Sequence, residues 1–141
     1  MKRALEGGFE LDDDRSRVDI AAAHDFLSNH APWALGWSYA EVERLLREAE
    51  LVIGLYHGER LIGLTRTVSD GHWLTYLADV YVLPEYRGRG LGAELVRATV
   101  EEGPYAQLGW LLHTADASGL YKKFGFVMRS DYLMERPAPQ S

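Results

Sequence analysis

The spacing of apolar and polar residues predicts two helices in the first third of the chain. Residues 17–29 carry an apolar stripe at helical spacing, and Ser16 followed by Asp19 resembles a capping box at its start. Ser38 followed by Glu41 is a second capping box, and a second apolar stripe follows it. We therefore expect one helix at 17–29 and another that begins after Ser38.

The apolar spacing changes after residue 50 to the pattern of β-strands. Two β-rich runs, at 51–56 and 61–68, are separated by residues 57–60, which are typical of a hairpin turn. A further turn at 69–71 precedes a long apolar run at 73–83. These runs predict three consecutive strands.

The remaining pattern predicts alternating helices and strands. The elements expected after the long strand are a helix at 91–102, a strand at 108–113, a helix at 117–124 and a final strand at 126–134. Asp116 is expected to cap the second of these helices and Gly125 to end it. With a very short strand near Phe9, the set predicts a mixed α/β domain that has helices on both faces of one sheet.

Composition narrows the classes of function. The chain has 141 residues, with 15 Lys and Arg against 21 Asp and Glu, and it has no cysteine. The absence of cysteine excludes disulfides, a cysteine nucleophile and thiolate metal sites, and the five histidines lack the spacing of zinc motifs, so we expect no metal. No cluster of basic residues marks a nucleic-acid-binding face, so no nucleic-acid partner is expected.

Neither a membrane span nor a signal peptide is expected. The longest apolar run, 73–83, is interrupted by Thr75 and Asp79 and is much shorter than the roughly 20 residues that a span needs. The N-terminus has no hydrophobic segment of signal-peptide length. We therefore expect a cytoplasmic protein with no membrane partner.

The most distinctive motif is Arg87-Gly88-Arg89-Gly90-Leu91-Gly92, between the long strand and the following helix. Glycines let the backbone adopt positive φ and approach a ligand closely, and a helix N-terminus offers free N–H groups. Together these features predict a pyrophosphate site, to which Arg87 and Arg89 add charge-assisted donors. The alternative is a glycine-rich turn with solvated arginines.

The same turn also fits the dinucleotide-binding pattern Gly-x-Gly-x-x-Ala through Gly88, Gly90 and Ala93. Its context argues against that interpretation, because the turn follows four predicted strands and no acidic residue ends the next strand about 20 residues later. A Gly-Lys-Ser/Thr sequence is missing as well, which excludes P-loop NTPases. A dinucleotide-binding enzyme is the less favoured alternative.

Two segments resemble the GNAT superfamily of N-acetyltransferases. Arg87-x-x-Gly90-x-Gly92, preceded by the strand 76–85, is similar to the family's acyl-CoA motif. Residues 117–126, with Tyr121 and Gly125, are similar to its Ala-x-x-x-Tyr-x-x-x-Gly-Phe block. The two matches lie in the family's order along the chain.

The resemblance implies a GNAT-like domain at 1–136, followed by a disordered tail at 137–141. Its central, mostly antiparallel, twisted sheet would have six to seven strands, with about four helices on both faces. The implied activity is transfer of an acetyl group from acetyl-CoA to a primary amine of a small molecule or peptide, without a metal. Since no cysteine can carry the acetyl group, we expect direct transfer in a ternary complex. The alternative is a non-catalytic acyl-CoA-binding or regulatory module, and the protein is expected to be a monomer or a homodimer.

The resemblance also implies which residues bind the cofactor. In this family the strand before the glycine turn bulges and splays from the next strand, and its main chain at Val80 and Val82 would pair with the pantetheine arm. The Val80 N–H would polarise the thioester carbonyl. The backbone amides that would hold the pyrophosphate are those of Arg87, Gly88, Arg89, Gly90, Leu91 and Gly92.

Tyr121 is the expected general acid, which would protonate the departing CoA thiolate. The alternative is a tyrosine packed in the core. Leu120 and Phe124, four residues apart, are expected to form the core face of this helix and to leave Tyr121 free for the ligand.

Asp79 is the expected general base, because it is the lone charge in an apolar run and a buried carboxylate is costly unless paired or used. The alternatives are a structural carboxylate bonded to Arg66, His113 or a backbone amide, a base that acts through water, and a substrate that arrives neutral. Two positions depart from the family pattern: Thr114 replaces a frequent Asn, and Tyr76 stands where several members place a catalytic Glu.

The acceptor pocket is expected at residues 30–37, between the first two helices. Trp33 and Trp37, with Asp25 nearby in an acidic N-terminal half, favour an amine or another cation. The alternative is an apolar lid that packs on the core.

Overall fold

The computed structural model describes residues 1–139, and its central feature is a six-stranded sheet whose strand order follows the chain. The strands are β1 Lys2–Leu5, β2 Phe9–Asp12, β3 Leu51–His57, β4 Arg60–Ser69, β5 Leu74–Val82 and β6 Gly109–Leu111. Neighbouring strands are antiparallel from β1 to β5, whereas β5 and β6 are parallel. The expected mixed α/β fold with a mostly antiparallel sheet is confirmed.

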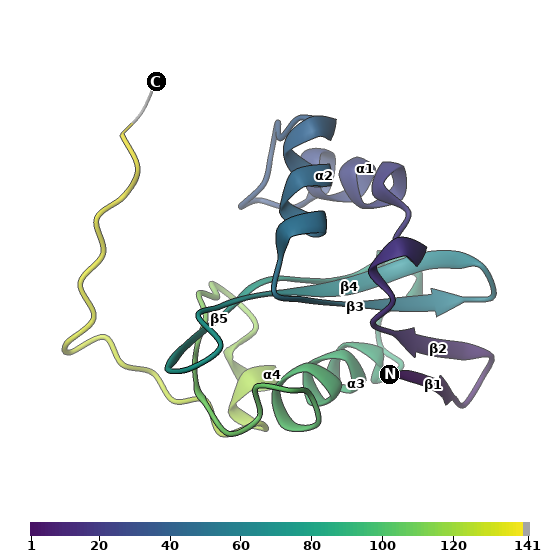
Figure 1. The fold of residues 1–141 in the computed structure, drawn as a ribbon. Helices are drawn as coiled ribbons and strands as arrows, with labels where there is room; N and C mark the ends of the chain where they lie inside the picture. The colour runs from purple at the N-terminus through teal and green to yellow at the C-terminus, as the bar shows by residue number, and fades with distance from the viewer. Residues whose placement is uncertain (140–141) are drawn as a thin grey trace.

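Helices cover both faces of the sheet, as expected (Figure 1). They are α1 Ile20–His30, α2 Tyr39–Glu48, α3 Leu91–Val96 and α4 Ser118–Lys122, and α3 continues into a π-helical turn, Arg97–Glu101. α1 and α2 lie on one face, and α3 and α4 lie on the other. None of the helices formed by residues 1–139 is long and apolar enough to cross a membrane.

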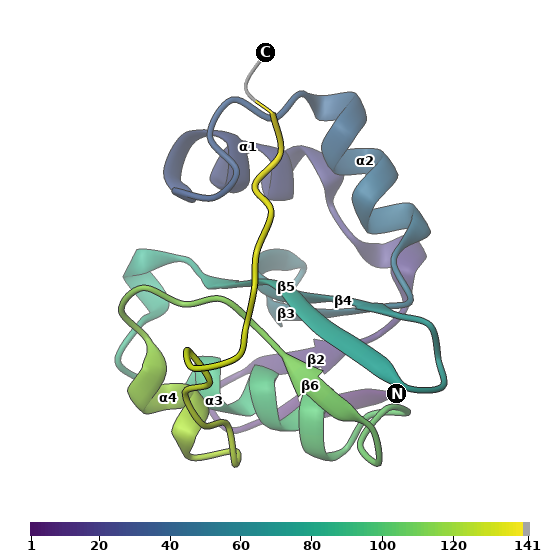
Figure 2. The same ribbon diagram turned by 90° about the vertical axis from the view of Figure 1, so that its left-hand side faces the viewer.

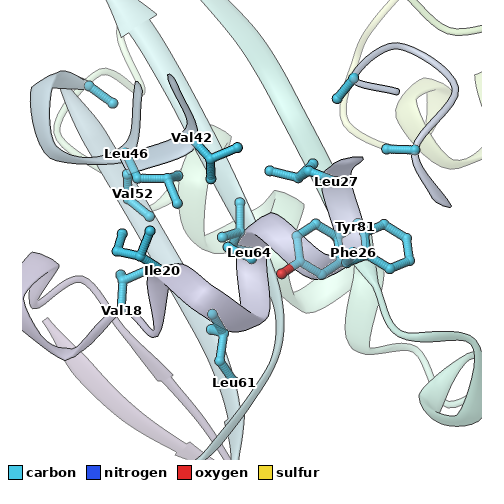
Figure 3. Close-up of a cluster of buried hydrophobic side chains, with 14 of the residues drawn as sticks. Val18, Ile20, Phe26, Leu27, Val42, Leu46, Val52, Leu61, Leu64 and Tyr81 are labelled. Carbon is cyan, nitrogen blue, oxygen red and sulfur yellow. The ribbon is translucent and has the colours of Figure 1, made fainter. Parts of the chain in front are cut away.

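Buried side chains form a core on each face of the sheet. Beneath α1 and α2, the ring of Tyr81 from β5 stacks on Phe26 with 4.2 Å between centroids (Figure 3). On the other face, Leu91, Leu95 and Ala98 of the helical segment expected at 91–102 pack against the sheet. Burial of one leucine side chain contributes about 1.5–3 kcal/mol to folding stability. The two cores together therefore hold a layer of helices against each face of the sheet.

Two local sequence signals are confirmed, one at the start of α2 and one in the hairpin of β3 and β4. The Ser38 hydroxyl accepts the Glu41 amide at 3.1 Å, and the Glu41 carboxylate accepts the Ser38 amide in return, which completes the capping box of α2. β3 and β4 are antiparallel and pair as far as His57 and Arg60, so the turn lies where it was expected. Each of these signals lies within four consecutive residues.

In the N-terminal segment one expectation is wrong and one strand was not predicted. Asp19, rather than Ser16, caps α1, because its carboxylate accepts an amide of the first helical turn at 3.1 Å. The short strand expected near Phe9 is confirmed as β2, but it forms a hairpin with the unpredicted β1 that turns at Gly7 and Gly8, whose φ values are +90° and +83°. Only glycine adopts such φ values without strain, so the paired glycines were the sequence signal for this turn.

The expectations for the C-terminal segment are wrong in two further places. α4 is not capped by Asp116; instead, the Thr114 hydroxyl accepts the Ala117 amide at 3.0 Å just before the helix. Residues 126–134 form no strand, because β6 is three residues long and offers a short edge for pairing. Of the tail expected to be disordered, 137–139 carry no helix or strand, and 140–141 lie outside the described residues.

Candidate active site

The strands β5 and β6 diverge after a short parallel contact. Only three pairs join them, Leu74 with Gly109, Thr75 with Trp110 and Tyr76 with Leu111, whereas β5 continues to Val82. Figure 2 shows the two strands side by side and their separate courses beyond this contact. The second half of β5 therefore has a free edge on the side of β6, which is the splay that the resemblance implied.

The main chain of Val80 and Val82 faces this free edge. The Leu83 amide donates to the Ile62 carbonyl of β4 at 2.8 Å, so alternate residues of the strand direct their amides toward β4. Val82 and Val80 fall on the other alternation, and their amides point away from β4. The Val82 carbonyl lies on the same edge and accepts the Arg87 Nε–H at 2.9 Å.

One extra residue in β5 changes which side chains face each layer. Arg66 pairs with Asp79 and Thr67 pairs with Leu77, so Ala78 is a β-bulge without a partner in β4. As a result, Leu77 packs in the cluster with Val96 below α3, while Asp79 lies on the face covered by α1 and α2. Leu77 and Asp79, which would share a face in a regular strand, therefore lie on opposite faces of the sheet.

The glycine turn at 87–92 is not filled by neighbouring side chains. Gly88 and Gly90 have φ of +79° and +78°, which only glycine adopts without strain. A Cβ added at Gly88, Gly90 or Gly92 would meet no atom within 4 Å. Glycine is thus not required at Gly92 by packing or by φ, and the turn leads directly into α3, for which Gly90 is the N-cap without a side-chain partner.

Tyr121 is the buried residue of α4, whereas Leu120 and Phe124 are only partly buried. This reverses the expected orientation of the helix, because the Tyr121 ring packs with Leu77 in the cluster that Val80 borders. Burial, followed by the Asp116 carboxylate, raises the pKa of the Tyr121 hydroxyl above its ordinary value of 10, so the group stays protonated at neutral pH.

Asp79 accepts a hydrogen bond on each of its carboxylate oxygens. Trp33 Nε1 donates to Oδ1 at 2.6 Å, and Arg66 Nε donates to Oδ2 at 2.5 Å. The side chains of Arg66 and Asp79 are 11% and 1% exposed, so this ion pair is buried. The pairing with Arg66 is one of the alternatives that the sequence left open, and the bond to Trp33 was not foreseen.

The aromatic loop between α1 and α2 divides into an exposed and a packed part. Trp37 packs against the core, and Trp33 keeps 48% of its surface exposed while it holds Asp79. Trp37 therefore packs on the core, as the lid alternative expected, whereas Trp33 remains accessible near β5.

A second polar group near the divergence of β5 and β6 was missed from the sequence. The Tyr76 hydroxyl and His113 Nδ1 are 2.5 Å apart, and His113 Nε2 and a Glu135 oxygen are 2.6 Å apart. The available signal was Tyr76 itself, which departs from the Glu that the resemblance implied at this position. Within residues 1–139, no group of three or more His, Asp or Glu side chains is arranged to hold a metal.

The family model of the acetyltransferase (GNAT) family matches residues 18–126. The chain belongs to the GNAT acetyltransferase family. A crystal structure of a protein from Xanthomonas campestris pv. campestris, described as belonging to this family, is 35% identical, with a TM-score of 0.86 over 93% of this chain and 94% of that one. The family fold and the order of its motifs thus agree with the sequence resemblance.

Two further GNAT relatives are more distant. An uncharacterized N-acetyltransferase, ycf52, from Pyropia yezoensis is 24% identical over 70% of this chain, and the match spans 62% of that protein's length. A GNAT acetyltransferase structure from Elizabethkingia anophelis with acetyl-CoA bound has 15% identity and a TM-score of 0.66, covering 89% of this chain and 80% of that one. At this identity the second likeness shows the shared fold alone.

Proposed function

We propose that this GNAT protein transfers an acetyl group from acetyl-CoA to a primary amine of a small molecule or peptide. The observation that carries the proposal is the free edge of β5, which runs directly into the unfilled glycine turn. An extended pantetheine arm fits such an edge because it can pair with free amides as a strand would. The structural relative with acetyl-CoA bound adds support for this choice of cofactor.

The diphosphate of the cofactor would bind the backbone amides of residues 87–92. Free N–H groups at the start of a helix favour an anion, and the glycines leave room for close approach. The Arg87 side chain would contribute to diphosphate binding only indirectly, because its Nε–H is already donated to the Val82 carbonyl. In this arrangement the Val80 amide lies along the strand from the diphosphate and would polarise the thioester carbonyl.

Tyr121 is proposed as the acid that protonates the CoA thiolate. Its hydroxyl is held protonated by burial, and its ring lies in the cluster bordered by Val80, whose amide is proposed to face the thioester. A protonated phenol beside a leaving thiolate can donate its proton as the C–S bond breaks. The acetyl group would pass directly to the amine, since the chain has no cysteine.

Asp79 is proposed to position the acceptor side rather than to take the proton. Both of its oxygens already accept hydrogen bonds, from Trp33 and Arg66, which leaves the carboxylate poorly placed to serve as a base. Its bond to the indole instead fixes the exposed Trp33 ring beside β5. An aromatic face of this kind can receive a cationic amine.

The proposal is tested by thiol release from acetyl-CoA in the presence of amines, amino acids, polyamines and peptides. We expect release with at least one acceptor class, and a roughly 10²-fold lower kcat for Tyr121→Phe with little change in the acetyl-CoA Kd. Tyr132→Phe is the matched control, because Tyr132 is exposed in the C-terminal segment.

The outcomes distinguish three kinds of protein. Binding of acetyl-CoA by calorimetry without thiol release from any acceptor would indicate a non-catalytic acyl-CoA-binding module. Stabilisation by NADH but not by acetyl-CoA would indicate a dinucleotide-binding protein. Unchanged turnover of Tyr121→Phe on a working acceptor would remove Tyr121 from the mechanism.

A further inference from the structure

Three residues from separate parts of the chain form a continuous polar row that consists of one hydrogen bond and one close contact of ion-pair type. The Tyr76 hydroxyl of β5 lies 2.5 Å from His113 Nδ1, just after β6, and His113 Nε2 lies 2.6 Å from a carboxylate oxygen of Glu135 in the C-terminal segment. The rings of Tyr76 and His113 meet edge to face, with 5.6 Å between centroids. The row therefore has a defined order from phenol to imidazole to carboxylate.

This row begins where β5 and β6 separate. Tyr76 pairs with Leu111 in the last rung between the two strands, and it pairs with Val68 across β4. Val68 and Arg66 are two residues apart in β4, so they share a face, and Tyr76 consequently lies on the same face as Asp79. That is the side proposed above for the acceptor.

The partners of His113 specify how its protons are arranged. A carboxylate can only accept, so the 2.6 Å contact with Glu135 favours the neutral ring that carries its proton on Nε2, and Nδ1 is then free to accept the Tyr76 hydroxyl. Burial, followed by the charges of Glu135 and Asp79, raises the pKa of Tyr76 above 10, which keeps this hydroxyl protonated. Arg66 opposes the effect. The phenol thus has a proton to give to the ring.

Building on the proposed acetyl transfer, we propose that Tyr76, His113 and Glu135 form the relay that removes the proton from the acceptor nitrogen. The amine reacts in its neutral form, after any ammonium proton has gone to solvent. As the nitrogen bonds to the acetyl carbon, its proton passes to Tyr76 Oη while the Tyr76 proton passes to His113 Nδ1, and Glu135 pairs with the imidazolium that forms. The C–S bond breaks and the thiolate takes the proton of Tyr121. The imidazolium then releases one proton to solvent and the Tyr121 phenolate takes one up, so atoms and charges balance.

The exposure of these groups favours the relay over Asp79 as the proton acceptor. The side chains of His113 and Glu135 are 57% and 59% exposed, so the ring can release its proton to solvent after each turnover. The Asp79 side chain is 1% exposed and bonded on both oxygens, so it has no comparable route.

The test compares His113→Ala and Tyr76→Phe with His72→Ala and Tyr132→Phe, which remove the same groups from exposed positions. We expect the first two to lower kcat roughly 10²-fold with unchanged acetyl-CoA Kd, and the controls to remain within about twofold. Added imidazole should restore part of the activity of His113→Ala, because removal of the exposed His113 ring leaves a gap that imidazole can enter. It should restore none of the activity of Tyr76→Phe. Glu135→Gln should remain active with kcat lowered about tenfold, because the imidazolium would lose its charged partner.

Each result separates the relay from the proposed function. Wild-type transfer with full activity in His113→Ala, or loss without imidazole rescue, would overturn the relay alone. An inactive wild-type protein would overturn both, because no acceptor proton would then be moved. Nitrogen NMR of the wild-type His113 ring gives a measurement that does not depend on activity, and a proton on Nδ1 instead of Nε2 would also overturn the relay.

Discussion

Replacing Gly90 with valine tests the glycine turn against a matched position elsewhere in the fold. Gly90 and Gly71 have φ of +78° and +75°, and a Cβ at either would meet no atom within 4 Å. Gly71 lies in the turn between β4 and β5, away from the free edge. Valine therefore brings the same backbone strain to both positions, about 1–2 kcal/mol for a left-handed conformation.

The expected changes in melting temperature follow from this backbone strain and from the stabilisation that a bound ligand gives. In a domain of this size 1 kcal/mol corresponds to roughly 4 °C, so Gly90→Val and Gly71→Val should both melt roughly 4–8 °C below the wild type. Acetyl-CoA at about 100 times its Kd stabilises a binding protein by about 2.7 kcal/mol, or roughly 10 °C. The wild type and Gly71→Val should gain this increment, and Gly90→Val should gain none, because its methyl groups would enter the space proposed for the diphosphate.

Thermal unfolding with and without acetyl-CoA measures both effects in one experiment. The ligand-free melts show whether the two substitutions cost the same, and the increments with ligand show which turn the cofactor contacts. An equal increment for Gly90→Val and Gly71→Val would refute the assignment of the diphosphate to this turn.

Two predictions concern the stability of the free protein. Asp79→Ala should lower the free energy of unfolding in urea by about 3–5 kcal/mol, because it leaves the buried Arg66 unpaired. The control is Glu48→Ala, which breaks the pair of Arg44 and Glu48, whose side chains are 77% and 66% exposed, and which should cost no more than about 0.5 kcal/mol. Equal losses in the two variants would contradict the reasoning. The amides of Trp73, His72 and Leu74 lower the pKa of Asp70 below 3.8, so its stabilising effect should be full above about pH 4 and be lost as the pH falls through the folded value; a carboxyl NMR midpoint at or above 3.8 would disprove this.

The sequence predicts those parts of the fold whose signals lie within a few residues of one another. Ser38 and Glu41 are three positions apart, and each supplies the partner that the other needs, so the start of α2 is readable without tertiary structure. The start of α1 is different, since both Asp14 and Asp19 can cap a turn there and the structure uses both. Competition between nearby caps, rather than a missing signal, explains why Ser16 was chosen wrongly.

The site depends on contacts between distant residues, and these are less predictable. Trp33 and Asp79 are 46 positions apart, and Tyr76 and His113 are 37 apart, so neither bond has a local pattern. The glycine turn was expected from its own closely spaced glycines and arginines, whereas the free edge of β5 was expected only from the family resemblance. The burial of Tyr121 was missed because apolar spacing within a five-residue helix does not determine which face meets the core.

The bulge at Ala78 sets the faces of the two residues that precede it. If Ala78 paired regularly with β4, Leu77 would pair with Val68 in place of Tyr76. Leu77 would then take the place beside His113, and the phenol of Tyr76 would enter the apolar layer below α3. The bulge therefore works as a spacer: register slippage that straightened β5 would exchange these two side chains, whereas a replacement at Ala78 that kept the bulge would leave both in place.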